Sequence, residues 1–155
     1  MHKLILRREM PSGNPICDDP LLDRLYRSRH IKNSQELDRT LASMHNPNLM
    51  SGVDSAVKLL VEAYQKQQHI VIVGDFDADG ATSTALAVLA LRQLGFVNVT
   101  YLVPNRFEQG YGLSVAVAKE ALALDVELLI TVDNGVSSHE GVAFLKTQGV
   151  KVIVT

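Results

Sequence analysis

The sequence predicts an α/β protein built on a Rossmann-like, doubly wound parallel sheet. Two observations favour this fold class. Short apolar runs of Val, Ile and Leu alternate with segments of helical periodicity through the last two thirds of the chain, and this alternation is typical of parallel βαβ units. Hydrophobic residues make up 46% of the sequence, while aromatic residues make up only 5% and Trp is absent. An aliphatic core of this kind suits strands that helices cover on both faces.

The predicted elements follow one another from residue 51 onward. An apolar stripe that starts near Ser51 and Asp54 predicts a first helix. Strands are expected at residues 69–73, 97–103, 127–132 and 150–155, and helices at 81–94, 114–124 and 138–147. Gly95 and Gly149 are expected to end two of these helices. Residues 137–140 resemble a capping box at the start of the last one.

Residues 1–50 differ in character and predict an N-terminal helical extension, followed by the core domain at 51–155. An alternation at residues 3–7 predicts an edge strand, and helical spacing predicts helices at 20–29 and 33–44. The arginines of this extension form either a solvated face or a basic flank for a polyanion. Thr155 falls at the end of a strand of the buried type, so we expect the sequence to be a truncated fragment.

Composition limits the compartment and the partners of the protein. The formal net charge of −2 provides no overall basic field for nucleic acid. A single cysteine, Cys17, fits a reducing compartment. The sequence contains neither the apolar core of a signal peptide nor an apolar run as long as a membrane span. We therefore expect a cytoplasmic protein that makes no membrane contact.

An acidic cluster follows the first core strand. Asp75, Asp77 and Asp79 place three carboxylates within five residues, where they repel one another unless a cation is present. The helix that follows begins with small residues, among them Ser83, and a helix N-terminus favours anions such as phosphate. The pattern therefore predicts a site for a metal ion and a phosphate.

Other interpretations of the cluster remain open. A calcium EF-hand loop needs a glutamate at its twelfth position, where this sequence has Leu86. The glycine fingerprint of a dinucleotide-binding fold is absent. A phosphatase in which Asp75 or Asp77 attacks phosphorus is an alternative, as is an acidic turn exposed to solvent.

A second acidic motif, Asp133-Asn134-Gly135, follows the third core strand, and Asn134 is a candidate for binding a phosphate there. The carboxyl ends of parallel strands meet at one edge of the sheet, where ligands bind. We therefore expect Asp133 to lie close to Asp77 and Asp79 and to bridge two cations that activate water and neutralise a phosphoryl group.

The segment after the second core strand lies at the same edge. Arg106 is a candidate for gripping a phosphate, and Phe107 or Tyr111 for stacking on a base. The alternative is that both aromatic residues anchor the loop and that Arg106 is solvated. His139 falls in the first turn of a helix at this edge and is expected to support the site rather than bind a metal.

Four segments resemble the DHH phosphoesterase superfamily and, within it, the RecJ family of single-strand-specific DNA exonucleases. They are VIVGDFDADGATSTAL (71–86), YLVPNRFEQGYGLS (101–114), LITVDNGVSSHEG (129–141) and LLDRLYRSRHIKNSQEL (21–37). They are spread from residue 21 to residue 141, so the resemblance extends over nearly the whole chain.

The resemblance implies a function for the acidic residues. Asp77, Asp79 and Asp133 would coordinate Mn²⁺ or Mg²⁺ in a two-metal site, with Asp75 as an adjacent acid. It implies hydrolysis of single-stranded DNA from the 5′ end to mononucleotides in recombination and repair, with a single-strand-binding protein and a RecQ-type helicase as partners. The Asp-His-His motif of the superfamily is expected beyond Thr155, so we expect this chain alone to be inactive.

Two alternatives to this function are kept. The first is another phosphodiesterase or a pyrophosphatase of the same superfamily. The second is a module that binds nucleic acid without catalysis.

Overall fold

The computed structural model describes Glu9 and residues 12–155, and the chain divides into two compact units, Met1–Met50 and Ser51–Thr155. The strand expected at residues 3–7 lies outside the described residues. The described residues of the first unit form one α-helix, α1 (Pro20–Ser28), and three 3₁₀ helices, η1 (Ser34–Leu37), η2 (Leu41–Ser43) and η3 (Pro47–Leu49). Asp19 caps α1, because its carboxylate accepts hydrogen bonds from the N–H groups of Leu21 and Leu22.

The continuous helix expected at residues 33–44 was a wrong prediction, because η1 and η2 are separate short turns. Asp38 interrupts the helix, since its carboxylate accepts a hydrogen bond from Thr40 N–H at 2.9 Å. Leu41 and Met44, the apolar residues of this segment, are 85% and 70% exposed. Without an apolar partner, so short a segment gains too little from burial to form an α-helix.

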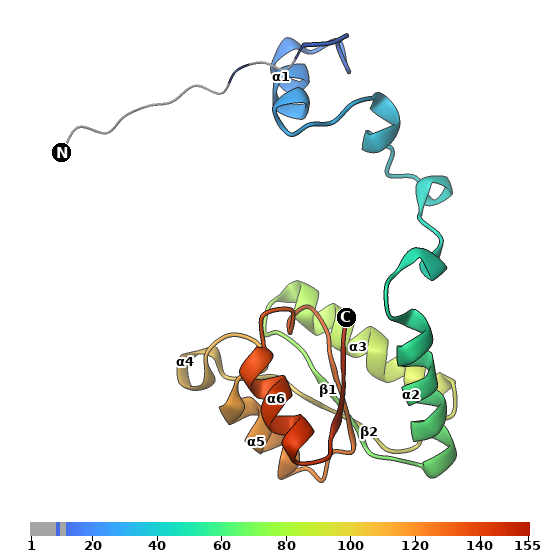
Figure 1. Ribbon diagram of the computed structural model, residues 1–155, viewed down its shortest axis with the longest axis vertical. Helices are drawn as coiled ribbons and strands as arrows, with labels where there is room; N and C mark the ends of the chain where they lie inside the picture. Colours follow the sequence, from blue (N-terminus) through green and yellow to red (C-terminus); the bar gives the residue numbers. More distant parts are fainter. Residues whose placement is uncertain (1–8, 10–11) are drawn as a thin grey trace, which may run out of the picture. The chain divides into compact units, whose positions relative to one another are not determined.

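The second unit is a four-stranded parallel sheet with helices on both faces, so the predicted fold class is confirmed (Figure 1). The strand order is β2-β1-β3-β4. The strands are β1 (Ile70–Val73), β2 (Val99–Leu102), β3 (Leu128–Thr131) and β4 (Lys151–Val154). The helices are α2 (Val53–Lys66), α3 (Ala78–Gln93), α4 (Arg106–Gln109), α5 (Val115–Leu122) and α6 (His139–Thr147).

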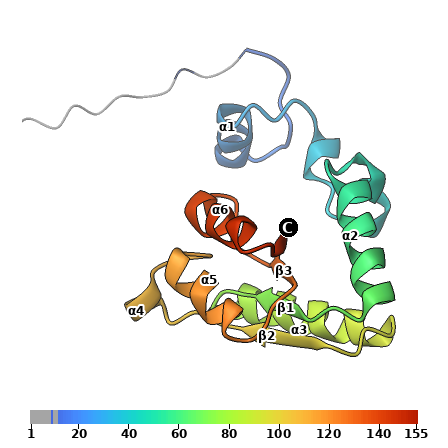
Figure 2. The ribbon, with the colours of Figure 1, turned by 60° about the horizontal axis from the view of Figure 1, so that its bottom comes forward.

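Two apolar layers hold the helices against the sheet. Ile70 and Ile72 of β1 face one layer, which includes Ala63 of α2 and Val88 of α3. Val71 and Val73 face the other layer, with Val117 of α5 and Leu145 of α6. Figure 2 shows α5 and α6 on the opposite side of the sheet from α3. All four residues of β1 are fully buried, as expected for a central strand that is covered on both faces.

The strand register brings the two acidic motifs to the same edge of the sheet. The β1–β3 pairing ends with Val73 opposite Thr131. Asp75 and Asp133 each lie two residues beyond this last pair. The loops after β1 and β3 are therefore neighbours, although more than fifty residues separate them in sequence.

The structure differs from the sequence-based expectation at three points on this edge. Helix α3 starts at Ala78 rather than at residue 81, and Asp77 caps it by accepting a hydrogen bond from Gly80 N–H. The four-residue helix α4 was not predicted, because so short a helix has no hydrophobic periodicity. The capping box expected at residues 137–140 was wrong, because Ser138 is the N-cap of α6 and its hydroxyl accepts a hydrogen bond from Leu113 N–H rather than from the helix.

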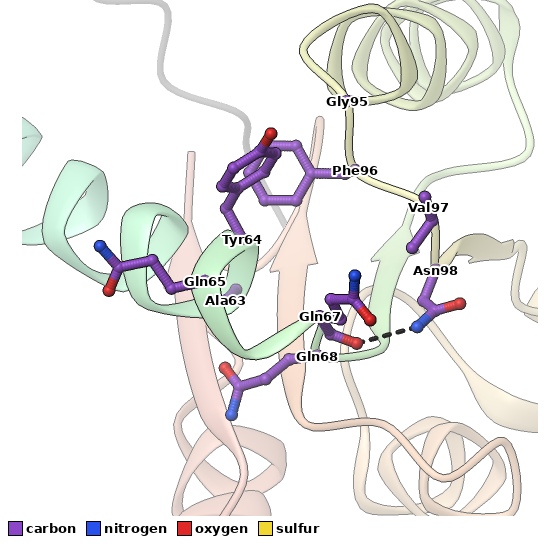
Figure 3. Close-up of a pocket in the computed structure, with 9 residues that line it drawn as sticks. All are labelled: Ala63, Tyr64, Gln65, Gln67, Gln68, Gly95, Phe96, Val97 and Asn98. Carbon is purple, nitrogen blue, oxygen red and sulfur yellow. Dashed lines mark hydrogen bonds between the residues drawn. The ribbon is translucent and has the colours of Figure 1, made fainter.

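A hollow of about 260 Å³ lies at the opposite, amino-terminal edge of the sheet (Figure 3). The rings of Tyr64 and Phe96 meet edge to face in its wall, with their centroids 5.3 Å apart. Asn98 donates a hydrogen bond from its side-chain amide to the carbonyl of Gln67 at 2.8 Å. Among the described residues, no carboxylate or imidazole lines this hollow. None of the helices in the described part of the chain is both long and apolar enough to span a membrane.

Candidate metal centre

The loop after β1 carries three aspartates in different environments. Asp75 is buried, and its carboxylate accepts a hydrogen bond from Phe76 N–H at 2.8 Å. Asp77 is exposed and holds the first turn of α3 through its bond with Gly80 N–H at 3.0 Å. Asp79 is exposed in that first turn. The local fold follows from the sequence, because aspartate is a preferred N-cap and an acidic first turn complements the helix dipole.

The loop after β3 turns sharply at Asp133. This residue has a φ of 59°, in the left-handed region that aspartate and asparagine tolerate better than most residues. Gly135 follows with a φ of 105°, and a Cβ there would lie 2.4 Å from Thr131 Oγ1. The turn therefore folds back tightly on the end of β3 and needs glycine at this position.

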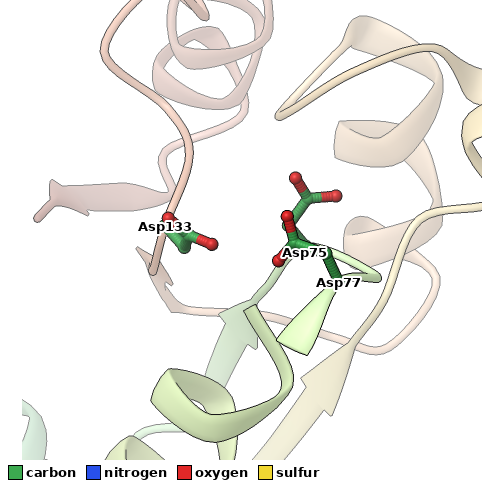
Figure 4. A group of neighbouring side chains, drawn as sticks. All are labelled: Asp75, Asp77 and Asp133. Atoms are coloured by element: carbon green, nitrogen blue, oxygen red, sulfur yellow. The ribbon is translucent and has the colours of Figure 1, made fainter. Parts of the chain in front are cut away.

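Asp75, Asp77 and Asp133 form a compact group, with one carboxylate oxygen from each lying within 4.8 Å of the others. Figure 4 shows Asp133 approaching from the loop after β3, opposite Asp75 and Asp77. The structure thus brings together residues from both acidic motifs, as the strand-end argument predicted. Asp79 is not one of the three, although it is close enough to raise the pKa of Asp133.

The proximity of the acids has a clear electrostatic effect. Partial desolvation raises the pKa of the Asp133 carboxyl above its ordinary value, and the negative charges of Asp77, Asp79 and Asp75 raise it further. A proton or a cation at this point would relieve the repulsion. The group is therefore built to attract positive charge.

Arg106 is the positive group already present at this edge. Its guanidinium Nη2 donates to both carboxylate oxygens of Asp75, at 2.9 and 3.2 Å. The same guanidinium lies 3.9 Å from the centre of the Phe76 ring and 5.2 Å from that of Tyr111, which adds cation–π attraction. Asp75 is thus partly neutralised, whereas Asp77 and Asp133 have no such cationic partner among the described residues.

Tyr111 links the same segment to the second loop. Its hydroxyl donates a hydrogen bond to the backbone carbonyl of Asp133 at 3.3 Å. The chain from residue 106 to residue 111 therefore contacts both acidic loops. Sequence reasoning singled out Arg106 and Tyr111 but missed Phe76. The signal for Phe76 was an aromatic residue placed between two acids of a polar loop.

Three of the remaining predicted residues lie on α3, α4 and α6. Phe107 is fully exposed in α4 and is free to meet a ligand. Ser83 donates its hydroxyl hydrogen to the backbone carbonyl of Asp79 at 2.7 Å. His139 is exposed at the first residue of α6. None of these three belongs to the acidic group.

Asn134 differs from its predicted place, because it lies in the interior. It is 6% exposed. Its amide nitrogen donates to the carbonyls of Val73 and Val132, at 3.1 and 2.9 Å. Both amide hydrogens are thus directed at backbone, and neither is available to a phosphate.

The donor set fits a hard divalent cation. Mg²⁺ and Mn²⁺ prefer oxygen ligands, and an octahedral ion that holds its ligands at about 2.1 Å separates adjacent oxygens by roughly 3 Å. Three carboxylate oxygens within 4.8 Å need only small side-chain rotations to reach that spacing. The described part of the chain offers no sulfur or imidazole ligand in this group.

Comparison with known proteins gives the family. The DHH family, N-terminal domain, matches residues 69–155, which is more than half of the chain. The chain belongs to the DHH family. Its acidic group and parallel sheet are therefore those of a DHH domain, in agreement with the resemblance drawn from the sequence.

Relatives of this DHH chain are single-stranded-DNA-specific exonucleases named RecJ. The protein from Haemophilus influenzae is 71% identical over 155 residues, which is all of this chain and 27% of that protein. The protein from Escherichia coli is 54% identical over 136 residues, 88% of this chain and 24% of that protein. The chain thus spans about a quarter of the length of these relatives.

Solved structures resemble the DHH chain as well. A crystal structure of exonuclease RecJ bound to manganese matches with a TM-score of 0.62 and 40% identity, over 68% of this chain and 27% of that one. RecJ from Thermus thermophilus in complex with Mn²⁺ matches with a TM-score of 0.59 and 32% identity, over 83% of this chain and 17% of that one. Both structures therefore contain the ion that suits the donor set of this chain.

Proposed function

We propose that this DHH domain supplies metal ligands to an exonuclease that hydrolyses single-stranded DNA from the 5′ end to mononucleotides. The observation that carries the proposal is the meeting of Asp77 and Asp133, from two distant loops, at one edge of the sheet. The names of the relatives support the substrate.

Asp77, Asp79 and Asp133 would hold Mn²⁺ or Mg²⁺. Asp77 and Asp133 belong to the acidic group of the structure and also to the ligand set that the family resemblance implies. Asp75 is the weaker candidate, because Arg106 and Phe76 N–H already engage its oxygens. Asp79 is exposed in the first turn of α3 and is the better third ligand. Two bound ions would supply Lewis-acid activation of water and of the phosphodiester.

The residues around the acids would bind and orient the DNA strand. Arg106 sits beside the acidic group and carries a planar donor group that suits a phosphate. Phe107 is fully exposed and Tyr111 is 58% exposed, so either ring can stack on a base. Ser83 lies in the second turn of α3, and His139 is the first residue of α6. Both would support the phosphate rather than the metal.

The cellular setting follows from the family resemblance alone. The enzyme would act in DNA recombination and repair in the cytoplasm, with a single-strand-binding protein and a RecQ-type helicase as partners. The 155 residues by themselves would be inactive, because three clustered carboxylates hold a cation weakly.

A chimera tests the activity directly. This chain would replace the matching 155 residues of the Haemophilus influenzae protein, with which it is 71% identical. We expect the purified chimera to degrade 5′-labelled single-stranded DNA with Mn²⁺ and to spare duplex DNA. Asp77→Asn and Asp133→Asn should each abolish digestion, and Asp54→Asn, at the start of α2, should not.

Three results would count against the proposal or a part of it. The first is a folded chimera that leaves single-stranded DNA intact in the presence of Mn²⁺. The second is full digestion by the Asp77→Asn or Asp133→Asn chimera. The third, robust digestion by the 155-residue chain alone, would refute only the expected inactivity of that chain.

A further inference from the structure

We propose that Asn134 is a positioning residue that sets the separation between the two acidic loops. Its side-chain amide bridges the carbonyl of Val73, at the end of β1, and the carbonyl of Val132, just after β3, at 3.1 and 2.9 Å. We call this pair of hydrogen bonds the Asn134 bridge. The inference deepens the proposed function and, in its metal-binding consequence, depends on it.

The bridge lies where the β1–β3 pairing comes to an end. Val73 is opposite Thr131 in the last paired position, and Val132 N–H donates to Val73 O at 3.0 Å. Beyond this bond the two strands continue out of the sheet as the acidic loops. The amide of Asn134 adds a further link across the same gap, so it acts as an extra rung that a side chain supplies.

The two carbonyls that accept from Asn134 are close in sequence to Asp75 and Asp133. Val73 is two residues before Asp75, and Val132 is directly before Asp133. A change in the distance between these carbonyls therefore moves one acidic loop relative to the other. Because like charges repel, the loops need a fixed link when no cation is present. The bridge provides that link from within the buried layer under the site.

Burial makes the bridge specific for asparagine. The side chain is 6% exposed, and its Oδ1 atom has no hydrogen-bond partner among the described residues. Aspartate has the same size but no amide hydrogens, so its carboxylate would face two backbone carbonyls and repel both. Alanine would leave the Val132 carbonyl without this donor. The Asp133 turn and the close packing of Gly135 on Thr131 bring residue 134 back toward the sheet.

Backbone amide exchange tests the bridge without any metal. We expect Asn134→Asp and Asn134→Ala to speed hydrogen exchange of Val132 N–H roughly five- to tenfold, the effect of losing about one hydrogen bond. Glu127 N–H donates to His69 O at the other end of the same strand pair, at 3.0 Å. Its exchange should not change, because a local loss affects only the carboxyl end of the pair. Asn98→Ala removes a similar amide-to-carbonyl bond at the opposite edge and is the matched control.

The second measurement is Mn²⁺ affinity, followed by the electron paramagnetic resonance signal of free Mn²⁺. At temperatures where all chains are folded, Asn134→Asp should weaken Mn²⁺ binding about tenfold and Asn98→Ala should leave it unchanged. Unaltered Val132 exchange in both Asn134 variants would overturn the proposal, as would equal acceleration at Glu127 or unaltered Mn²⁺ affinity. If the unmodified chain failed to bind Mn²⁺ at millimolar concentration, the proposed metal site would be refuted. The exchange result would then decide the bridge alone.

Discussion

The guanidinium of Arg106 lies 2.9 Å from Asp75 Oδ2, so the domain carries its own positive charge beside the acids that are proposed to hold a metal ion. The carboxylate of Asp75 is only 10% exposed, whereas Arg106 is 44% exposed. This ion pair has consequences for both stability and metal affinity.

Arg106→Gln should change the two properties in opposite directions. Loss of the pair should lower the free energy of unfolding of the metal-free chain by about 1 kcal/mol, because a mostly buried carboxylate loses its partner. Mn²⁺ affinity should rise a few-fold, because a competing positive charge is removed. Denaturant unfolding and Mn²⁺ titration measure the two effects. Arg92→Gln is the control, since Arg92 donates to Val99 O, away from the acids. Weaker Mn²⁺ binding by Arg106→Gln would contradict the expectation.

Asp79 and Asp75 can be separated by substitution. We expect Asp79→Asn to weaken Mn²⁺ binding by tenfold or more and Asp75→Asn to weaken it less, because Arg106 already neutralises Asp75. Isothermal titration of both variants gives the order directly. The reverse order would make Asp75 the third ligand. Its oxygen does lie within 4.8 Å of those of Asp77 and Asp133, and only its ion pair with Arg106 argues against it.

Ionisation of Asp133 should destabilise the metal-free fold. Its pKa is raised by desolvation and by the neighbouring carboxylates, so the folded chain binds this proton more tightly than the unfolded chain does. The resulting loss in the free energy of unfolding is absent below the ordinary pKa of 3.8 and reaches its full size once the pH exceeds the raised pKa of the folded chain. Asp133→Asn should therefore be more stable than the unmodified chain at neutral pH, and the difference should vanish at about pH 3.

A matched control exists for this substitution. Asp125 is exposed and also has a positive φ, 56° against 59° for Asp133. Asp125→Asn therefore reports the backbone preference of asparagine without the acidic group. Equal, pH-independent stabilisation by both substitutions would show that the carboxylate repulsion plays no part.

Glu62 should contribute stability with the opposite dependence on pH. Hydrogen bonds from Lys151 and Lys66 lower the pKa of Glu62 from 4.5 to about 2. The contribution is present above pH 4.5 and is lost as the pH falls toward 2. Glu62→Gln should therefore be less stable than the unmodified chain at neutral pH and equal to it near pH 2. Urea unfolding across this pH range measures the difference in unfolding free energy between the two chains. A difference that stayed constant with pH would show that the ion pairs of Glu62 are not its cause.

Gly80 tests the packing of the first acidic loop against α3. In a free helix, alanine is preferred to glycine by about 1 kcal/mol, so helix preference alone would make Gly80→Ala stabilising. A Cβ at this position would lie 2.3 Å from the carbonyl oxygen of Asp75. We therefore expect a loss of about 2–3 kcal/mol in unfolding free energy. Ala81→Gly in the same turn should lose only about 1 kcal/mol, and a stabilising Gly80→Ala would disprove the close contact.

Sequence reasoning was successful where a rule connects residue order to position in space. The alternation of apolar runs predicted the parallel sheet, and the common edge of parallel strands predicted that Asp77 and Asp133 would meet. The rule concerns backbone geometry, and it therefore holds without knowledge of side-chain conformations.

The rest of the site depends on side-chain packing, which no periodicity encodes. The contact of Arg106 with Asp75 requires the short helix α4 to be in place. The inward orientation of Asn134 follows from the turn at Asp133 and from the tight packing of Gly135. Neither the pairing nor the orientation could be predicted from the types and spacing of the residues.

The strand order has one more consequence for how the domain tolerates change. Because β1 and β3 are direct neighbours, the points where the two acidic loops leave the sheet are separated by the hydrogen-bonding distance between adjacent strands, about 4.8 Å. Substitutions in the helices that cover the sheet can therefore alter the melting temperature while the acidic rim of the sheet keeps its dimensions. Robustness of the fold and geometry of the rim are, to this extent, free to evolve separately.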